Sequence, residues 1–117
     1  MGSISIRRVY EPPATGARRI LVDRVWPRGL SKEDAAVDLW LKEVGPSTEL
    51  RKWFNHDPER FEEFARRYRD ELAGSEAYAR LLEEARTHDD VELAYSAKDT
   101  EHNQAVVLLG LLGEESL

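Results

Sequence analysis

The sequence has 117 residues, a length typical of one domain, with a formal net charge of -6 and a pI near 5.1. It contains no cysteine, which excludes disulfides, thiol nucleophiles and thiolate zinc sites. No apolar stretch approaches the roughly 20 residues that span a bilayer, and the amino terminus lacks the layout of a signal peptide, so we expect a cytoplasmic protein. The acidic balance disfavours broad attraction to nucleic acid or to an anionic membrane.

Two short strands are predicted near the amino terminus. Apolar residues alternate loosely over 4–10 and form a run over 19–26, which Pro27 and Gly29 end. Only about ten residues join the two strands, whereas a parallel crossover usually needs a dozen or more. Their relative direction therefore stays open.

A helical turn and a further strand are predicted next. Ser31 and Asp34 resemble a capping box, which favours a short helical turn. Over 37–44, Val37, Leu39 and Leu41 recur at period two, which favours a strand, although a helix also fits this segment.

Helix-start signals dominate the second half of the chain. Ser47, Asp57-Pro58 and Gly74-Ser75 precede predicted helices at 48–55, 58–73 and 76–87. A strand over 91–97 and a helix over 100–112 follow. Residues 105–112 are apolar nearly all round, which is typical of a core helix or of one that a second copy covers in a homodimer. We expect a single α/β domain over 1–117, with loose tails over 1–3 and 113–117.

Three loops are candidates for a binding site. If the strands at 19–26, 37–44 and 91–97 lie parallel, the loops after them meet at one edge of the sheet, where ligands bind in open α/β folds. Two of these loops lead into helix amino termini, which favour anions, and arginine suits phosphate or carboxylate. The predicted anion-binding residues are Arg24, Arg28, Ser47, Thr48, Ser96 and Asn103. Alternatively, Arg24 pairs with Asp23 or a neighbouring acid, and Arg28 is a solvated turn residue.

Acid and base groups occur in the same loops. Asp23, Lys98 and His102 are the candidate catalytic residues, and Trp26 is placed to stack on a planar ligand. Asp99 and His102 are spaced for an acid/base pair or for two metal ligands. A helix cap at Asp99 or Thr100 and a surface His102 explain the spacing more simply, so we expect no metal site. Ser47 is placed like an exposed nucleophile, yet such a serine more often caps a helix.

Long motifs cover nearly the whole chain: Leu21-Val22-Asp23-Arg24-Val25-Trp26-Pro27-Arg28-Gly29, Pro46-Ser47-Thr48-Glu49-Leu50-Arg51-Lys52, His56-Asp57-Pro58-Glu59-Arg60-Phe61 and Tyr95-Ser96-Ala97-Lys98-Asp99. In these motifs the chain resembles the YeaO-like branch of domain-of-unknown-function family 488. The resemblance implies a small α/β fold with a mostly parallel sheet of about four strands. The sister branch looks as if it carries cysteines where this chain has Tyr95 and Asn103, so its thiol or metal chemistry is not carried over.

Three functions remain open at this stage. The first is a domain that binds a small phosphorylated or carboxylated molecule, such as a nucleotide, and acts on it if the acid and base groups reach it. The second is a nucleic-acid-binding or regulatory protein whose basic face consists of Arg7, Arg8, Arg18, Arg19, Arg24 and Arg28. The third is an interaction module that dimerises through residues 105–112.

Overall fold

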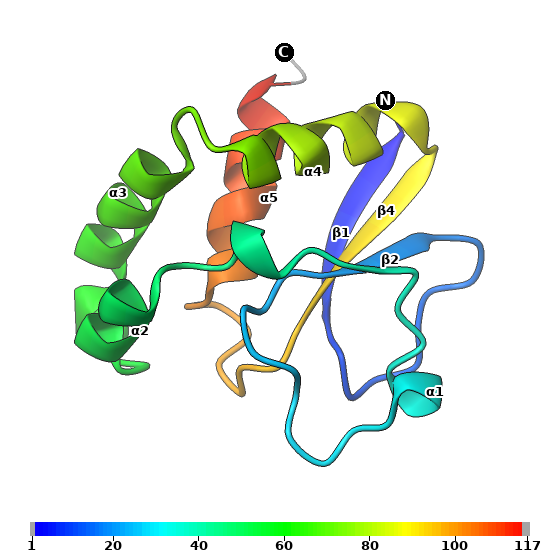
Figure 1. Cartoon of the computed structure of the whole chain (residues 1–117), viewed down its shortest axis with the longest axis horizontal. Helices are drawn as coiled ribbons and strands as arrows, with labels where there is room; N and C mark the ends of the chain where they lie inside the picture. Colours follow the sequence, from blue (N-terminus) through cyan, green and yellow to red (C-terminus); the bar gives the residue numbers. More distant parts are fainter. Residues whose placement is uncertain (1, 116–117) are drawn as a thin grey trace.

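Four parallel strands form the sheet in the computed structural model, which describes residues 2–115 (Figure 1). The strands lie in the order β1-β4-β2-β3, and all three neighbouring pairs are parallel. Their bounds are Ser3–Arg8 for β1, Arg18–Leu21 for β2, Leu39–Trp40 for β3 and Asp90–Tyr95 for β4. The predicted α/β fold with a mostly parallel sheet is confirmed, and the carboxyl ends of all four strands point the same way.

The predicted helices are present, and their starts follow the expected caps. The Ser47 hydroxyl accepts a hydrogen bond from the Leu50 amide at 3.1 Å, and the Ser75 hydroxyl accepts one from the Tyr78 amide at 3.2 Å. The helices are α1 (Lys32–Ala35), α2 (Thr48–Phe54), α3 (Phe61–Leu72), α4 (Glu76–Thr87) and α5 (Gln104–Glu115), with 3-10 turns at Lys42–Val44 and Pro58–Arg60.

Two predicted strands are much shorter than the sequence pattern indicated. The strand predicted over 37–44 is wrong outside Leu39–Trp40, because Lys42–Val44 forms a 3-10 turn. This turn buries Leu41 and Val44, which lie three residues apart, on the same side. The strand predicted over 19–26 ends at Leu21, and the residues after it form the loop that bears Asp23.

The last helix begins later and runs further than predicted. Asp99 accepts hydrogen bonds from the amides of Glu101 and His102, which forms a separate turn. The Asn103 side-chain oxygen then accepts from the Val106 amide at 3.2 Å, so α5 begins after Asn103. Residue 3 and residues 113–115, predicted as tails, belong to β1 and α5; residues 1, 116 and 117 lie outside the described range.

The connection between β1 and β2 is an extended loop. The two strands are parallel and lie on either side of β4, and residues 9–17 link them without a helix. A loop of this length can connect two parallel strands without a helix, because it reaches roughly 30 Å when extended, whereas a six-residue strand spans about 20 Å. The Ala14 amide donates to the Glu92 carboxylate at 3.1 Å, which fixes the loop against the sheet.

The main core lies between one face of the sheet and helices α2 to α5 (Figure 1). The apolar stretch of α5 contributes Ala105, Val107, Leu108 and Leu112 to this core, all of them buried. The prediction of a homodimer was based on the apolar surface of α5, and most of that surface is buried within the chain itself. A smaller cluster on the other face contains Leu21, Ala94 and Ala35 of α1.

Candidate functional site

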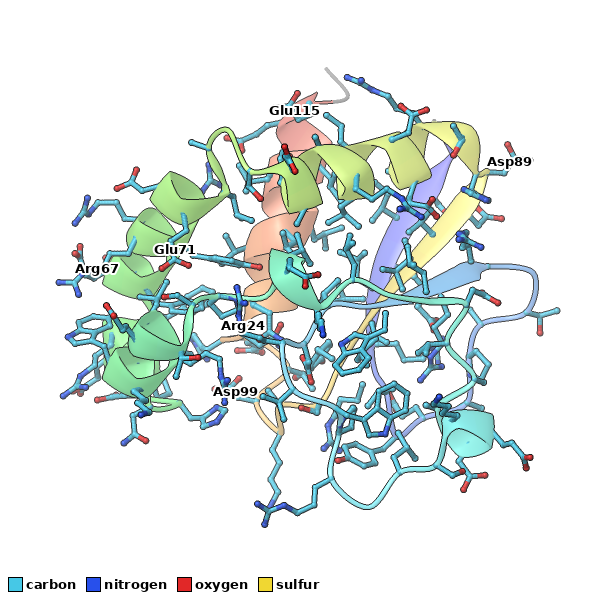
Figure 2. The ribbon with its side chains drawn as sticks, viewed as in Figure 1. Arg24, Arg67, Glu71, Asp89, Asp99 and Glu115 are labelled. Atoms are coloured by element: carbon cyan, nitrogen blue, oxygen red, sulfur yellow. The ribbon has the colours of Figure 1, made fainter. Side chains whose placement is uncertain are left out.

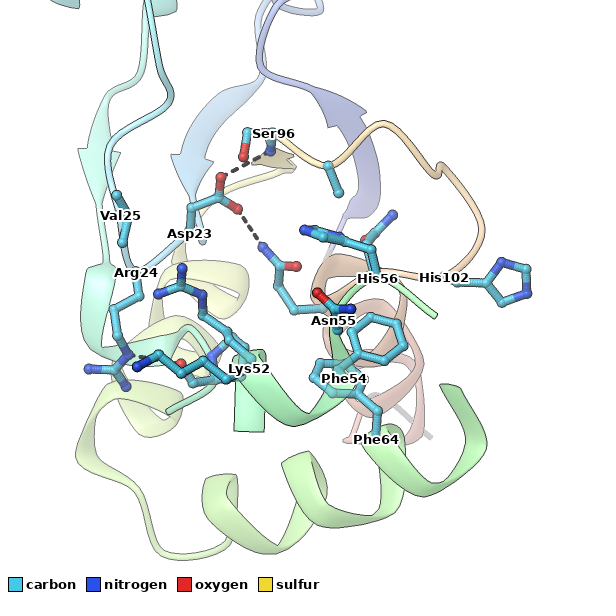
Figure 3. Close-up of a pocket in the computed structure, with 15 residues that line it drawn as sticks. Asp23, Arg24, Val25, Lys52, Phe54, Asn55, His56, Phe64, Ser96 and His102 are labelled. Atoms are coloured by element: carbon cyan, nitrogen blue, oxygen red, sulfur yellow. Dashed lines mark hydrogen bonds between the residues drawn. The ribbon is translucent and has the colours of Figure 1, made fainter. Parts of the chain in front are cut away.

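A cavity of about 320 Å³ lies where the chain leaves β2 and β4 (Figure 3). Its wall comes from the loop after β2, from α2 and the residues after it, and from the segment that leads from β4 into α5. The lining residues are Asp23, Arg24, Val25, Pro46, Arg51, Lys52, Phe54, Asn55, His56, Phe64, Ser96, Ala97, His102, Asn103 and Gln104. The cavity lies at the carboxyl ends of parallel strands, which is the position that ligands occupy in open α/β sheets.

Asp23 is a buried carboxylate in this wall, with only 5% of its surface exposed. One oxygen accepts a hydrogen bond from the Ser96 amide at 3.0 Å, and the other accepts one from the side-chain amide of Gln104. Burial raises the pKa of Asp23 above its ordinary value, against the opposing effect of these hydrogen bonds and of the Arg51 charge. Asp23 thereby joins β2, β4 and α5 at the cavity.

Two cationic side chains of α2 also line the cavity. Arg51 and Lys52 are exposed, and neither forms an ion pair or a side-chain hydrogen bond with any residue in the range 2–115. With Arg24 they contribute three positive charges, against the single carboxylate of Asp23, so the lining has a formal charge of 3 - 1 = +2 with histidine neutral. The cavity is therefore locally positive on a chain whose net charge is -6.

Arg24 holds the loop that leads into α2. Its guanidinium donates to the carbonyls of Pro46 and Gly45, both at 2.9 Å. A Cβ on Gly45 would lie 2.8 Å from the Arg24 amide nitrogen, so this approach requires glycine. In the view of Figure 2, Arg24 lies among the elements of the fold, whereas Arg67 and Asp89 point outward from its rim. The alternative interpretation, in which Arg24 pairs with Asp23 or a neighbouring acid, is wrong among the described residues, because Arg24 donates to carbonyls instead.

The backbone after α2 adopts an uncommon conformation at the cavity. Asn55 and His56 have φ values of 48° and 54°, and both residues line the cavity. Asn55 caps α2 by donating its amide to the Arg51 carbonyl, a common role for asparagine. A second left-handed residue directly after the cap is strained, and such strain clusters at functional sites.

His102 lies in the lining and forms a pair with Asp99. The Nδ1 atom of His102 is 2.9 Å from a carboxylate oxygen of Asp99, and the ring contacts Phe61 edge-on. The pKa of Asp99 is lowered, chiefly by the hydrogen bond from the Glu101 amide. Asp99 thus caps a turn and contacts the His102 ring. The acid/base role of this pair stays a prediction.

Several residues predicted for the site lie elsewhere. Ser47 donates its hydroxyl to Glu71 at 2.6 Å and caps α2, while Thr48, Arg28 and Lys98 are exposed outside the lining. The indole of Trp26 donates to the Leu30 carbonyl at 2.7 Å and packs edge-on against Trp40. The structure thus brings together Asp23, Arg24, Ser96, His102 and Asn103 from the predicted set.

The cavity also contains residues that the sequence did not single out, chiefly Arg51, Lys52, Asn55, His56 and Gln104. Two features of the sequence could have identified some of these residues. Arg51 and Lys52 occur in one of the long motifs, and Arg51 and Asn55 are four residues apart and therefore lie on one face of the helix.

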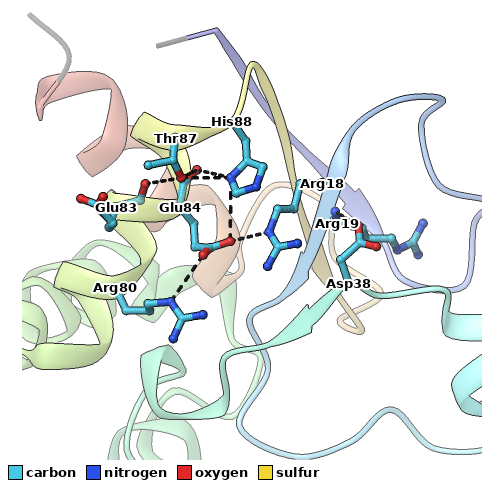
Figure 4. Close-up of polar contacts among 8 residues, drawn as sticks. All are labelled: Arg18, Arg19, Asp38, Arg80, Glu83, Glu84, Thr87 and His88. Atoms are coloured by element: carbon cyan, nitrogen blue, oxygen red, sulfur yellow. Dashed lines mark hydrogen bonds and ion pairs between the residues drawn. The ribbon is translucent and has the colours of Figure 1, made fainter.

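The arginines of the predicted basic face are largely engaged within the chain. Arg18 pairs with Glu84, which also meets Arg80 at 3.4 Å (Figure 4). Arg19 is 1% exposed and lies 3.2 Å from the Glu92 carboxylate, which also accepts from Arg7. Other members donate to carbonyls, namely Arg8 to those of Ala97 and Ser96 and Arg24 to those of Gly45 and Pro46. A continuous basic surface does not result from these residues.

Within residues 2–115, no three histidine, aspartate or glutamate side chains gather closely enough to hold a metal ion. No helix in this range is long and apolar enough to cross a membrane.

Comparison with known proteins supports the resemblance found in the sequence. Residues 3–117 match the family DUF488-N3i, described as the inactive DUF488-N3 subclade. The uncharacterized protein YeaO of Escherichia coli is 44% identical over 107 residues, which cover 91% of this chain and 93% of that protein. The uncharacterized protein Rv3073c of Mycobacterium tuberculosis is 52% identical over 80 residues, 67% of each chain. No solved structure matches. The chain belongs to the inactive DUF488-N3 subclade.

Proposed function

We propose that this chain is a non-catalytic domain that binds a small anionic molecule in the cavity beside α2. The observation that carries the proposal is the position of Arg51 and Lys52 in the wall of a cavity on an acidic chain, where neither forms an ion pair within residues 2–115. Arginine offers a planar set of donors that suits phosphate or carboxylate, and lysine adds a mobile charge.

The size and lining of the cavity support a small-molecule ligand. Its volume of about 320 Å³ lies at the lower end of the range for ligand pockets. Phe54 and Phe64 provide an apolar part, and Asn55 and Ser96 provide hydrogen-bonding groups. This combination of an apolar wall with a few polar groups is typical of ligand sites.

Two observations favour binding over catalysis. The matched subclade is described as inactive, and Lys98, one of the three candidate acid or base groups, lies outside the lining. Asp23 is fixed by hydrogen bonds from Ser96 and Gln104, which suits a group that orients a ligand.

Isothermal titration calorimetry with inorganic phosphate and small organic phosphates tests the proposal. The double variant Arg51→Gln/Lys52→Gln should bind at least about tenfold more weakly than the parent, because it removes two charge-assisted contacts. A matched control is Lys32→Gln/Arg86→Gln, which changes the net charge equally at exposed positions outside the cavity and should leave binding unchanged. Equal weakening in both double variants, or no binding of any phosphate or carboxylate by the parent, would contradict the proposal.

A further inference from the structure

The cavity combines a buried carboxylate with cationic side chains, and this combination restricts the ligand. We infer that the bound molecule carries a hydroxyl or amino group close to its anionic group, and that Asp23 accepts a hydrogen bond from that donor. The inference rests on the proposed function and names the ligand class, a small hydroxylated or aminated phosphate or carboxylate.

Asp23 has acceptor capacity beyond its present partners. Its oxygens accept hydrogen bonds from the Ser96 amide at 3.0 Å and from the Gln104 side chain, and the Ser96 hydroxyl adds a further one. An ionised carboxylate offers about four acceptor sites, so Asp23 can accept one more donor. Because Asp23 is already anchored to β4 and α5, a ligand donor meets an acceptor whose position is fixed (Figure 3).

The same carboxylate disfavours an anion that has no donor. Arg51 is close enough to Asp23 for its charge to oppose the rise in the pKa of that carboxyl group. An anion bound by Arg51 therefore lies in the field of Asp23, and like charges repel more strongly in a partly buried site than in water. A hydroxyl or amino group between the two replaces this repulsion with a charge-assisted hydrogen bond.

The volume indicates a small ligand. A cavity of about 320 Å³ lies at the lower end of the range for ligand pockets. Glycerol 3-phosphate is a small molecule of this class and carries two hydroxyl groups. The Asn55 side chain also lines the cavity and makes no hydrogen bond with the described residues, so it can contact a second hydroxyl.

The test compares two ligands that differ only in their hydroxyl groups. Calorimetry at neutral pH and constant ionic strength measures the binding of glycerol 3-phosphate and of n-propyl phosphate to the parent protein. We expect glycerol 3-phosphate to bind about tenfold or more tightly, as a hydrogen bond to a charged group predicts. In Asp23→Asn, propyl phosphate should bind more tightly than it does to the parent and glycerol 3-phosphate more weakly.

The outcomes separate this inference from the proposed function. If the parent binds both phosphates with equal affinity through Arg51 and Lys52, the inference is wrong and the proposed function stands. If the parent binds neither ligand nor any other phosphate or carboxylate, the proposed function fails as well. An Asp23→Asn variant that alters both affinities by the same factor rules out Asp23 as the selective group. The comparison on the parent holds even if the variant does not fold.

Discussion

Asp23 is a residue whose burial costs stability and whose position serves the cavity. Its carboxylate is nearly enclosed, and burial raises its pKa, so the folded protein pays for keeping the group ionised. A neutral amide of the same shape can accept from the Ser96 amide and donate to the Gln104 side chain, once the Gln104 amide turns over to present its oxygen in place of its NH2 group. Retaining a costly charge where an amide fits is typical of a functional position.

Asp23→Asn should therefore be more stable than the parent at neutral pH. A raised pKa means that the folded state takes up a proton more readily than the unfolded state, so the cost is full above the folded pKa and is lost as the pH falls below the ordinary value of 3.8. Thermal unfolding of both proteins across this pH range should show a difference in Tm that is largest at neutral pH and closes in acid. A variant that is less stable than the parent at neutral pH would show that the ionised carboxylate stabilises the fold.

The left-handed backbone at His56 can be tested in the same way. His56→Gly and His56→Ala both remove the imidazole, but only alanine keeps the steric cost of a φ near 54°. We expect the glycine variant to be more stable by about 0.5 to 1 kcal/mol, measured by urea unfolding. Equal stabilities would mean that this backbone is not strained.

At the scale of elements, the loop that leads into α2 sets the position of Arg51 and Lys52. Arg24 binds the carbonyls of this loop, the Tyr68 hydroxyl donates to the Val44 carbonyl, and Glu71 accepts from Ser47. The loop is thus held on one side by Arg24, which follows β2, and on the other by Tyr68 and Glu71 of α3.

Gly45→Ala should disturb this loop. The added Cβ would lie 2.8 Å from the Arg24 amide nitrogen and 3.2 Å from the Val22 carbonyl oxygen, so the backbone must shift. We expect a loss of about 1 to 3 kcal/mol in the free energy of unfolding, with weaker phosphate binding in the folded fraction. The matched control is Gly110→Ala in α5, where the nearest atom is 3.7 Å away and the helix should gain up to about 1 kcal/mol. Equal effects at both glycines would contradict the steric account.

Some helix and strand boundaries were predicted and others were not. The boundaries set by neighbouring residues are visible in the sequence, whereas those set by residues distant in sequence are not. The starts of α1, α2 and α4 depend on serine caps a few residues away, and these local signals were visible in the sequence. The bounds of β2 and β3 depend on partner strands distant in sequence, and alternation alone overestimated them. The late start of α5 depends on the choice between Asp99 and Asn103 as the cap, which a sequence pattern does not decide.

At the scale of the whole molecule, the parallel sheet explains why part of the site was predictable. The carboxyl ends of all four strands lie at the same end of the sheet. The loops after β2 and β4 therefore meet there and bring Asp23, Ser96 and His102 to one cavity. The sequence did not indicate that α2 would turn Arg51 and Lys52 toward this edge, because helix orientation is set by core packing. Most arginines outside the cavity pair with acids or bind carbonyls, which leaves the cavity as a distinct cationic site on an acidic chain.

The central claim is that the cavity beside α2 is where this chain binds a small anion. The most direct measurement is a titration of inorganic phosphate into ¹⁵N-labelled protein at constant ionic strength, followed by amide NMR shifts. The account predicts saturable shifts confined to the cavity, at Arg51, Lys52, His56 and Ser96. It predicts none at Arg18 or Asp89, which lie at the amino ends of β2 and β4. Shifts spread evenly over the surface, or largest around Arg18, would contradict it.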